Sequence, residues 1–260
     1  MASLNSGSNG NCYYIGNGAD SVLIDAGISC RETERRMVRL GLSIRTIRAI
    51  FITHEHTDHT RGAEVLSRKY GIPVHITEAT YKHSRMKLEP GMMKTFIPGF
   101  PLPVGLLMVT PFSKRHDASD PVSFTVTGNG LTVGVFTDIG IACNAVKQHM
   151  SQCHAAFLES NYDEQMLENG RYPVHLKRRI RGEKGHLSND QALELFIAHR
   201  SSFLNLLVLS HLSAENNDPQ RVLDIFNPQA NGTRIVVASR YEESEVYEIE
   251  CCRGESGSVG

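Results

Sequence analysis

Three histidines and a carboxylate stand within six residues, directly after an apolar run that is typical of a buried strand. The run Ala49–Ile52 leads through one threonine to His54, His56, Asp58 and His59. Imidazole and carboxylate are the ligands that borderline divalent ions such as Zn²⁺ prefer. Two histidines spaced two residues apart at a strand end can bend toward one ion, while the Asp-His step that follows faces another. The spacing therefore predicts a metal site rather than a solvated, histidine-rich turn.

Further reactive side chains stand where other apolar runs end. Asp138, Glu159 and His211 each follow the apolar residues of a separate predicted strand. Residues at equivalent strand ends tend to gather along one edge of a sheet, where a site can form. A shared metal centre needs separate contributions of this kind, so these residues support the prediction from residues 54–59.

A basic segment precedes a predicted helix in the second half of the chain. Residues 175–186 contain five Lys or Arg residues and one acidic residue, and they end at His186. Such a run is most often a solvated surface, but here it leads into a helix entry, where backbone N–H groups favour anions. We therefore expect it to contact an anionic substrate. The candidate contacts are Lys177, Arg178, Arg179, Arg181, Lys184, Ser188 and Asn189.

The composition places few limits on the partners. The 260 residues fit one large domain or two small ones, and 40% hydrophobic and 21% charged residues are ordinary for a soluble protein. A net charge of −1 removes any argument from a globally basic surface, so a polyanion would need a local basic patch. The six cysteines lack CxxC spacing, which favours reduced thiols in a cytoplasm over disulfides or a cysteine zinc site.

The first residues show no basic segment followed by an apolar core of signal-peptide length. No window approaches the roughly 18–20 apolar residues of a membrane span. We therefore expect a cytoplasmic protein without membrane association, which also argues against an antibiotic-degrading role.

Hydrophobic periodicity predicts strands interleaved with helices. Strands are expected at 12–15, 21–24, 49–52, 72–76, 94–97, 106–112, 122–127, 131–137, 155–158, 204–210, 234–238 and 246–249. Helices are expected at 31–40, 61–70, 144–153, 189–200 and 219–226. The Gly-rich residues 5–11 form either a hairpin connection or an anion-binding loop. Two strand-rich halves of this kind suggest two sheets packed face to face with helices outside.

The His-x-His-x-Asp-His sequence at residues 54–59 matches the motif of the metallo-β-lactamase superfamily, and the chain most resembles its bacterial YycJ/WalJ group. Other matching segments lie at 6–11, 22–27, 116–121, 137–140, 158–161, 185–189 and 210–213. The resemblance implies an α+β fold, the four-layer αββα sandwich, and we expect a single domain over residues 1–253. The Gly/Ser-rich residues 254–260 are expected to form a flexible tail. Family members usually have a fuller first strand than this chain allows.

The resemblance also implies two divalent metal ions, with Zn or Mn expected and Fe as an alternative. The implied ligands are His54, His56 and His116 for one ion, and Asp58, His59 and His211 for the other. Asp138 would bridge the two ions, and Asp25 would orient a ligand histidine from behind. His116 lies in a loop-like neighbourhood, so His83 is a conceivable substitute for it.

Two such ions can activate a hydroxide at neutral pH, and Asp58 beside that water could aim it. The order of Glu159, His186 and His211 is similar to that in the nuclease branches of the superfamily, including the tRNA 3′-processing endonucleases. This similarity implies His186 as general acid or phosphate contact and Glu159 as its orienting partner. The YycJ/WalJ resemblance implies a 5′-to-3′ exonuclease of DNA repair, with DNA rather than RNA as partner.

Two other functions use the same residues differently. A small-molecule hydrolase, acting on a thiolester, lactone or cyclic phosphodiester, would bind its substrate almost independently of salt, whereas nucleic-acid binding weakens steeply with salt. A non-catalytic regulatory scaffold would lack metal ligands, whereas His or Asp fills all seven candidate positions. The sequence therefore favours a nuclease.

Overall fold

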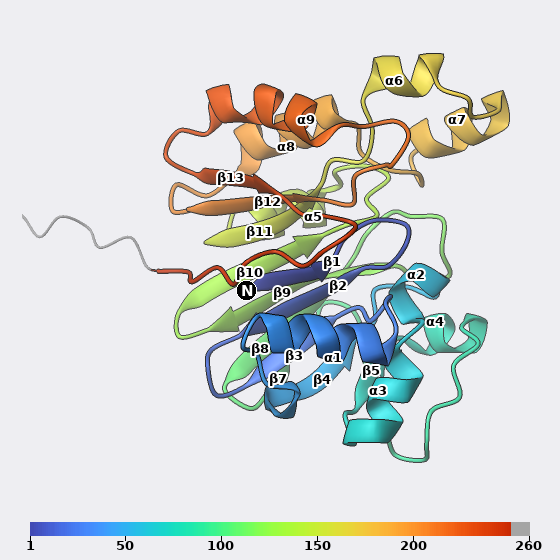
Figure 1. Cartoon of the computed structure of the whole chain (residues 1–260), viewed down its shortest axis with the longest axis vertical. Helices are drawn as coiled ribbons and strands as arrows, with labels where there is room; N and C mark the ends of the chain where they lie inside the picture. The colour runs from blue at the N-terminus through green and yellow to red at the C-terminus, as the bar shows by residue number, and fades with distance from the viewer. Residues whose placement is uncertain (251–260) are drawn as a thin grey trace, which may run out of the picture.

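Two β-sheets face each other at the centre of the fold, and helices cover both outer faces (Figure 1). The structure is a computed structural model, and it describes residues 1–250. Within that part of the chain, one sheet has six strands and the other has seven. This arrangement confirms the expected α+β fold, the four-layer αββα sandwich.

The first half of the chain forms the six-stranded sheet and the helices beside it. Its strands are neighbours in chain order: β1 (Ala2–Asn5), β2 (Cys12–Gly16), β3 (Ser21–Ile24), β4 (Ile47–Phe51), β5 (Val74–Ile76) and β6 (Met93–Thr95). Its helices are α1 (Cys30–Arg39), α2 (Thr57–Thr60), α3 (Ala63–Tyr70) and α4 (Glu78–His83). β1 and β2 pair antiparallel, so residues 6–11 connect the two strands of a hairpin.

The second half forms the seven-stranded sheet. Its strands, again neighbours in chain order, are β7 (Leu102–Val104), β8 (Leu107–Ser113), β9 (Val122–Gly128), β10 (Leu131–Phe136), β11 (Ala155–Glu159), β12 (Leu206–Ser210) and β13 (Arg234–Val237). Its helices are α5 (Asn144–Met150), α6 (Glu164–Asn169), α7 (Val174–Arg181), α8 (Asn189–His199) and α9 (Pro219–Phe226). α5, α8 and α9 cover the outer face, whereas α6 and α7 lie at the end of the sandwich (Figure 1).

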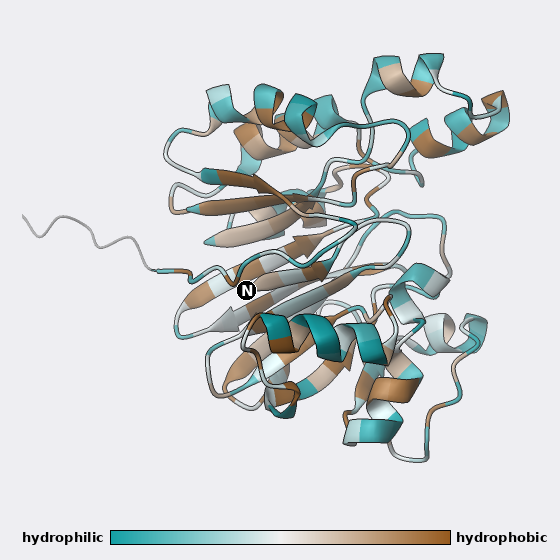
Figure 2. Ribbon diagram, viewed as in Figure 1, coloured by the Kyte–Doolittle hydropathy of each residue, from teal (hydrophilic) through white to brown (hydrophobic). Residues whose placement is uncertain are grey.

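Successive side chains of a strand point to opposite faces, so each strand of the sandwich has one face toward the core between the sheets and one toward the helices. In β11, Phe157 points into the core between the sheets, while Leu158 packs into the layer that contains Phe196 of α8. β12 is accordingly apolar along most of its length, whereas α1 is largely hydrophilic (Figure 2). A strand that is buried on both faces reads as a continuous apolar run, which explains why β11 and β12 could be predicted from sequence.

Two of the predicted helix starts carry side-chain caps. The Ser188 side chain accepts a hydrogen bond from the N–H of Gln191, whose own side chain bonds back, forming a capping box at α8. The Asp218 side chain caps α9, and Pro219 occupies its first turn. These local interactions fix where each helix begins.

Several elements differ from the sequence-based expectation. The predicted strand at 246–249 is wrong: Tyr247 exchanges two backbone hydrogen bonds with Met1 beside β1, but the segment continues no further as a strand. Strands β1 and β7 and helices α2, α4, α6 and α7 were not predicted. α7 has no buried residue, so no apolar stripe marks it in the sequence.

Five strands end at the same edge of the sandwich. β3 runs parallel to β4, and β10, β11 and β12 run parallel to one another. Immediately after three of these strands, the backbone turns through a left-handed conformation, with φ of 61° at Asp25, 53° at Asp138 and 58° at His211. Non-glycine residues rarely adopt such angles, and they tend to do so at functional sites.

The sheets share one apolar interior, which includes Phe51, Phe124 and Phe157. The single domain over residues 1–253 stays a prediction, and the tail at 254–260 lies outside the described residues. No helix within residues 1–250 is both long and apolar enough to cross a membrane.

Replacing Phe157 by alanine should lower the free energy of unfolding by about 3–5 kcal/mol. The ring is fully buried between the sheets, and its centroid lies 4.6 Å from that of Tyr13. The matched control is Phe100→Ala, because Phe100 is 66% exposed and its loss should cost less than about 0.5 kcal/mol. Urea unfolding followed by circular dichroism measures both variants, and equal losses would contradict this placement of Phe157.

Candidate metal centre

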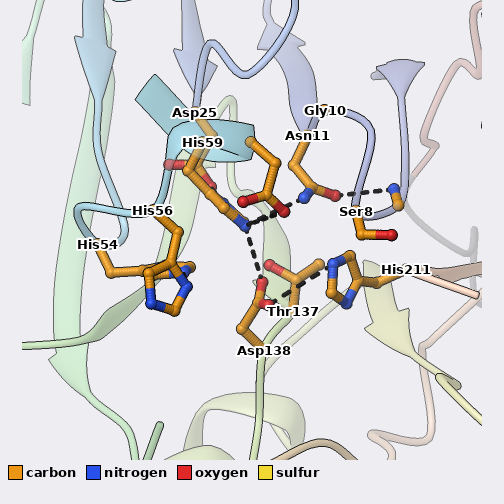
Figure 3. A network of polar contacts seen from close by, with 12 residues as sticks. Ser8, Gly10, Asn11, Asp25, His54, His56, His59, Thr137, Asp138 and His211 are labelled. Carbon is orange, nitrogen blue, oxygen red and sulfur yellow. Dashed lines mark hydrogen bonds and ion pairs between the residues drawn. The ribbon is translucent and has the colours of Figure 1, made fainter. Parts of the chain in front are cut away.

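The side chains that the sequence nominates as metal ligands meet at this edge of the sandwich (Figure 3). They form two groups: His54, His56 and His116 in one, and Asp58, His59 and His211 in the other. In each group, one ligand atom of every residue lies within 4.8 Å of the others. His116 and His211 follow strands of the second sheet, so both halves of the chain contribute to each group.

Asp138 lies between the two groups. Its Oδ2 is 3.3 Å from Nε2 of His59, and its Oδ1 is 3.6 Å from Nε2 of His211 and 3.8 Å from Nε2 of His116. The carboxylate is almost fully buried. Burial alone would raise its pKa, but the surrounding imidazoles, led by His211 and His59, hold it well below the usual range.

Two buried polar atoms here have no hydrogen-bond partner among the described residues: Asp138 Oδ2 and His211 Nε2. An unsatisfied buried polar atom costs free energy, so such atoms call for a partner. A divalent cation would satisfy both, and imidazole with carboxylate is a suitable donor set for it. The residues present therefore fit divalent metal ions.

Asp25 and Thr53 orient two of these histidines. Asp25 accepts hydrogen bonds from the Thr53 N–H at 2.8 Å, from the Thr53 hydroxyl at 2.9 Å and from His59 Nδ1 at 2.7 Å. The Thr53 oxygen in turn lies 2.9 Å from His54 Nδ1 and accepts its proton, because its own hydrogen points to Asp25. Both rings thus keep Nε2 for a metal, and Asp25 lies where an orienting residue must lie.

His116 receives its orientation from the backbone. Its Nδ1 donates to the carbonyl of Gly185 at 3.1 Å, which leaves Nε2 to face Asp138. His83 is instead exposed on α4, and its Nδ1 lies 2.9 Å from the Ala79 carbonyl of the same helix. The structure therefore brings His116, and not His83, to the metal groups.

The pKa values of these histidines shift in opposite directions. Burial disfavours charge on His59, but carboxylates led by Asp138 and Asp25 outweigh it and raise the pKa of His59 to about 9. Burial lowers the pKa of His116 to about 3 and that of His54 well below its usual value. His54 and His116 are thus neutral and ready to coordinate, whereas His59 carries a proton that a metal must displace.

Glu159 lies behind two rings and holds both. Its Oε1 accepts from Nδ1 of His186 at 2.7 Å and from Nδ1 of His211 at 2.9 Å, while Oε2 accepts from the backbone N–H groups of Ile139 and Leu187. Burial alone would raise the pKa of this carboxyl, but His186 and His211 outweigh it and lower the pKa to about 2. Glu159 is therefore an ionised acceptor that leaves Nε2 of each ring free.

A cavity of about 150 Å³ opens beside both groups. Its wall includes Asp58 and His186, together with two cationic side chains, Arg179 from α7 and Lys184 from the loop that follows. Ser8 of the β1–β2 connection lines the same cavity (Figure 3). The cavity therefore joins metal ligands, a titratable imidazole and positive charge.

Known proteins share this organisation. The family model described as the metallo-beta-lactamase superfamily matches residues 6–136. A Bacillus anthracis protein named exodeoxyribonuclease YycJ is 34% identical to this chain over 217 residues, which cover 82% of each sequence. The chain belongs to the metallo-β-lactamase superfamily.

Two further comparisons extend the similarity. Exodeoxyribonuclease WalJ of Streptococcus pneumoniae is 31% identical over 219 residues, which cover 82% of this chain and 81% of that protein. The crystal structure of the metallo-β-lactamase fold protein YhfI from Bacillus subtilis superposes with a TM-score of 0.70 at 14% identity, over 94% of this chain and 98% of that one. The expected resemblance and fold are confirmed, and the chain is a metallo-hydrolase whose fold implies divalent metal ions and whose His and Asp groups fit them.

The five Lys and Arg residues of the basic segment have three different surroundings: the cavity, helix α6 and solvent. Arg179 and Lys184 line the cavity, as expected for substrate contacts. Arg181 instead forms ion pairs with two glutamates of α6, at 2.9 and 2.8 Å, and Lys177 donates to a backbone carbonyl of α6. Arg178 is exposed and does not line the cavity. The two residues bonded to α6 hold the small helices together.

Ser188 and Asn189 were expected to contact substrate, but both are buried and neither lines the cavity. Ser188 caps α8, and the Asn189 side chain bonds to Ser160 and Asn217. The polar groups of both residues are thus bonded within the fold, so neither residue belongs to the proposed substrate contacts.

Three residues near the metal groups had no predicted role. Thr53 links Asp25 to the ligand rings, and the Asn11 amide nitrogen lies 3.1 Å from His59 Nε2. Lys114 is buried and donates to the Thr137 carbonyl at 2.6 Å, and burial lowers its pKa. Asn11 falls in a segment that resembles the family, which could have revealed it. A threonine just after a strand and a lone lysine carry no such signal.

Replacing Asp25 by alanine should weaken metal binding about 10- to 100-fold, because His59 and Thr53 lose the acceptor that orients them. The matched control is Asp20→Ala, which removes a carboxylate at the opposite end of β3, where it pairs with Arg48. Titration against a competing chelator measures the affinity, and a thermal melt verifies folding. Equal metal affinity in the two variants would remove Asp25 from this role.

Proposed function

We propose that this metallo-hydrolase cleaves phosphodiester bonds of DNA and acts as a 5′-to-3′ exonuclease. The observation that carries the proposal is His186, held by buried Glu159 at the wall of a cavity that Arg179 and Lys184 also line. The names of the two similar proteins, YycJ and WalJ, support DNA as the substrate class.

His186 has the position that a general acid needs. Its Nδ1–H is bonded to Glu159, so Nε2 is the atom that can hold or release a proton toward the cavity. When a phosphodiester hydrolyses, the water oxygen bonds to phosphorus, the bond to the leaving oxygen breaks, and that oxygen must gain a proton. We assign the proton donation to His186 Nε2, with Glu159 fixing the orientation of the ring.

Asp58 is proposed to aim the attacking water. Its carboxylate lines the cavity and lies 3.5 Å from His59 Nε2, within the second ligand group. When bound, the divalent ions supply Lewis acidity and lower the pKa of water to about 7. A hydrogen bond from that water to Asp58 would direct its oxygen toward phosphorus.

The two cations of the cavity favour a phosphodiester over a neutral ester. Lys184 and Arg179 lie on the wall, Arg179 in an exposed pair with Asp117 that a phosphate would replace, and guanidinium groups bind phosphate oxygens with good geometry. A thiolester or a lactone would gain little from them. We further propose zinc or manganese as the metal, with iron as an alternative, and DNA repair in the cytoplasm as the setting.

The proposal is tested by digesting end-labelled single- and double-stranded DNA and RNA, with each metal supplied in turn and with a thiolester and a lactone as controls. We expect stepwise shortening of DNA from the 5′ end. Activity on the esters alone, with intact nucleic acid, would replace the nuclease with the small-molecule hydrolase.

Replacing His186 by alanine should reduce turnover of DNA by about 10²- to 10⁴-fold, because the leaving oxygen loses its proton donor. Bound metal should stay near normal, since Asp138 and the two ligand groups remain in place. The control is His175→Ala, which removes an exposed histidine of α7 that does not line the cavity. Turnover and metal content are measured on the same preparations. Full activity of the His186 variant would exclude His186 as the acid.

A further inference from the structure

A second hollow, open to solvent and about 770 Å³ in volume, lies beside the metal cavity. The two hollows share three lining residues, His56, Asp58 and Arg179. From this shared rim the second hollow extends past α2 to Arg61, and to Arg85 in the loop after α4. We call it the α2–α4 groove. It continues outward from the point at which the proposed reaction occurs.

Two cations of the α2–α4 groove, Arg61 and Arg85, are available to a ligand. Arg61 and Arg85 are both exposed, and within residues 1–250 neither lies at ion-pair distance from a carboxylate. The nearest polar contact of Arg61 is the Asn9 carbonyl, 3.4 Å from Nη1. Arg48 and Arg115, by contrast, each pair with a carboxylate at 2.6 and 2.7 Å.

Two of the three carboxylates that line the groove, Glu55 and Glu64, are already bonded to protein groups. Glu55 accepts hydrogen bonds through Oε1 from the N–H and the hydroxyl of Ser119, at 2.9 and 2.6 Å. Glu64 has Oε1 3.4 Å from Arg68 and accepts the Lys87 N–H through Oε2 at 3.0 Å. The third carboxylate, Asp58, belongs to a metal group, while the guanidinium groups of Arg61 and Arg85 face solvent.

We infer that the α2–α4 groove binds the DNA strand next to the scissile bond, with Arg61 and Arg85 contacting its backbone phosphates. This inference rests on the proposed function. The metal cavity of about 150 Å³ holds little more than the reacting phosphate, so the rest of the strand must leave it. The groove offers a continuous path, and exposed guanidinium groups suit phosphate oxygens without reading sequence.

Arg61 and Arg85 then act on strand binding and not on the chemical step. Their loss should weaken the binding of an oligonucleotide but leave a small diester unaffected, because a single phosphate occupies only the metal cavity. Each lost phosphate contact to a single strand should also make the salt dependence of log KM shallower by about 0.7 per contact.

The test compares an Arg61→Ala/Arg85→Ala double variant with wild-type protein, both metal-loaded, on a single-stranded DNA oligonucleotide and on bis(p-nitrophenyl) phosphate. We expect KM for the oligonucleotide to rise roughly 10- to 100-fold, as for lost charged hydrogen bonds, while kcat/KM for the small diester stays within twofold. The control is Arg31→Ala/Arg45→Ala, which removes two exposed arginines outside the groove. Its KM should match that of wild type.

A binding measurement separates failure of this inference from failure of the proposed function. Fluorescence anisotropy with a labelled oligonucleotide that has cleavage-resistant phosphorothioate links gives Kd without turnover. If wild type cleaves DNA but the groove variant keeps the KM and Kd of the control, the groove is not a strand site. If wild type binds DNA through the groove but cleaves neither substrate, the groove inference stands and the nuclease proposal fails. Absence of binding by wild type overturns the inference.

Discussion

The buried carboxylate of Asp138 is the constraint on which the rest of the site depends. A carboxylate taken out of water is costly unless opposite charge and hydrogen bonds compensate it. Here the compensation comes from imidazoles on separate segments, since His59 follows β4 and His211 follows β12. Oδ2 still has no hydrogen-bond partner among the described residues. The site is thus assembled around a negative charge that needs cations, and metal binding and folding must stabilise each other.

Three of the five ligand rings are held through their other nitrogen by a group from elsewhere in the chain. His59 depends on Asp25 after β3, His116 on the Gly185 carbonyl after α7, and His211 on Glu159 after β11. Each of these supporting contacts joins distant segments within one half of the chain. The metal groups combine residues of both halves, so small displacements between the sheets would change the distances between the ligands directly.

Local patterns made part of this site predictable. The stretch from His54 to His59 is dense enough to identify alone, and Asp138 stands out because a carboxylate interrupts an apolar strand. His116 was assigned from family resemblance, because its loop has no periodicity. α7 escaped prediction because it buries no residue. The polar pair Ser188 and Asn189 was read as substrate contact, although the same residue types cap helices and fill buried networks. Sequence gives the polarity of a residue, whereas only the fold decides which partner satisfies it.

Arg179 shows how the fold can present a positive charge to a ligand at little cost in stability. Its guanidinium pairs with Asp117 at 2.8 Å, and both side chains are more than half exposed, at 60% and 53%. An exposed pair of this kind contributes only about 0–1 kcal/mol. Exchanging the Asp117 carboxylate for a phosphate therefore costs little free energy. Arg181 pairs with two glutamates of α6, so its release would break two ion pairs. Because Arg179 borders both the metal cavity and the α2–α4 groove, an anion that displaces Asp117 would meet the reacting centre and the strand path at once.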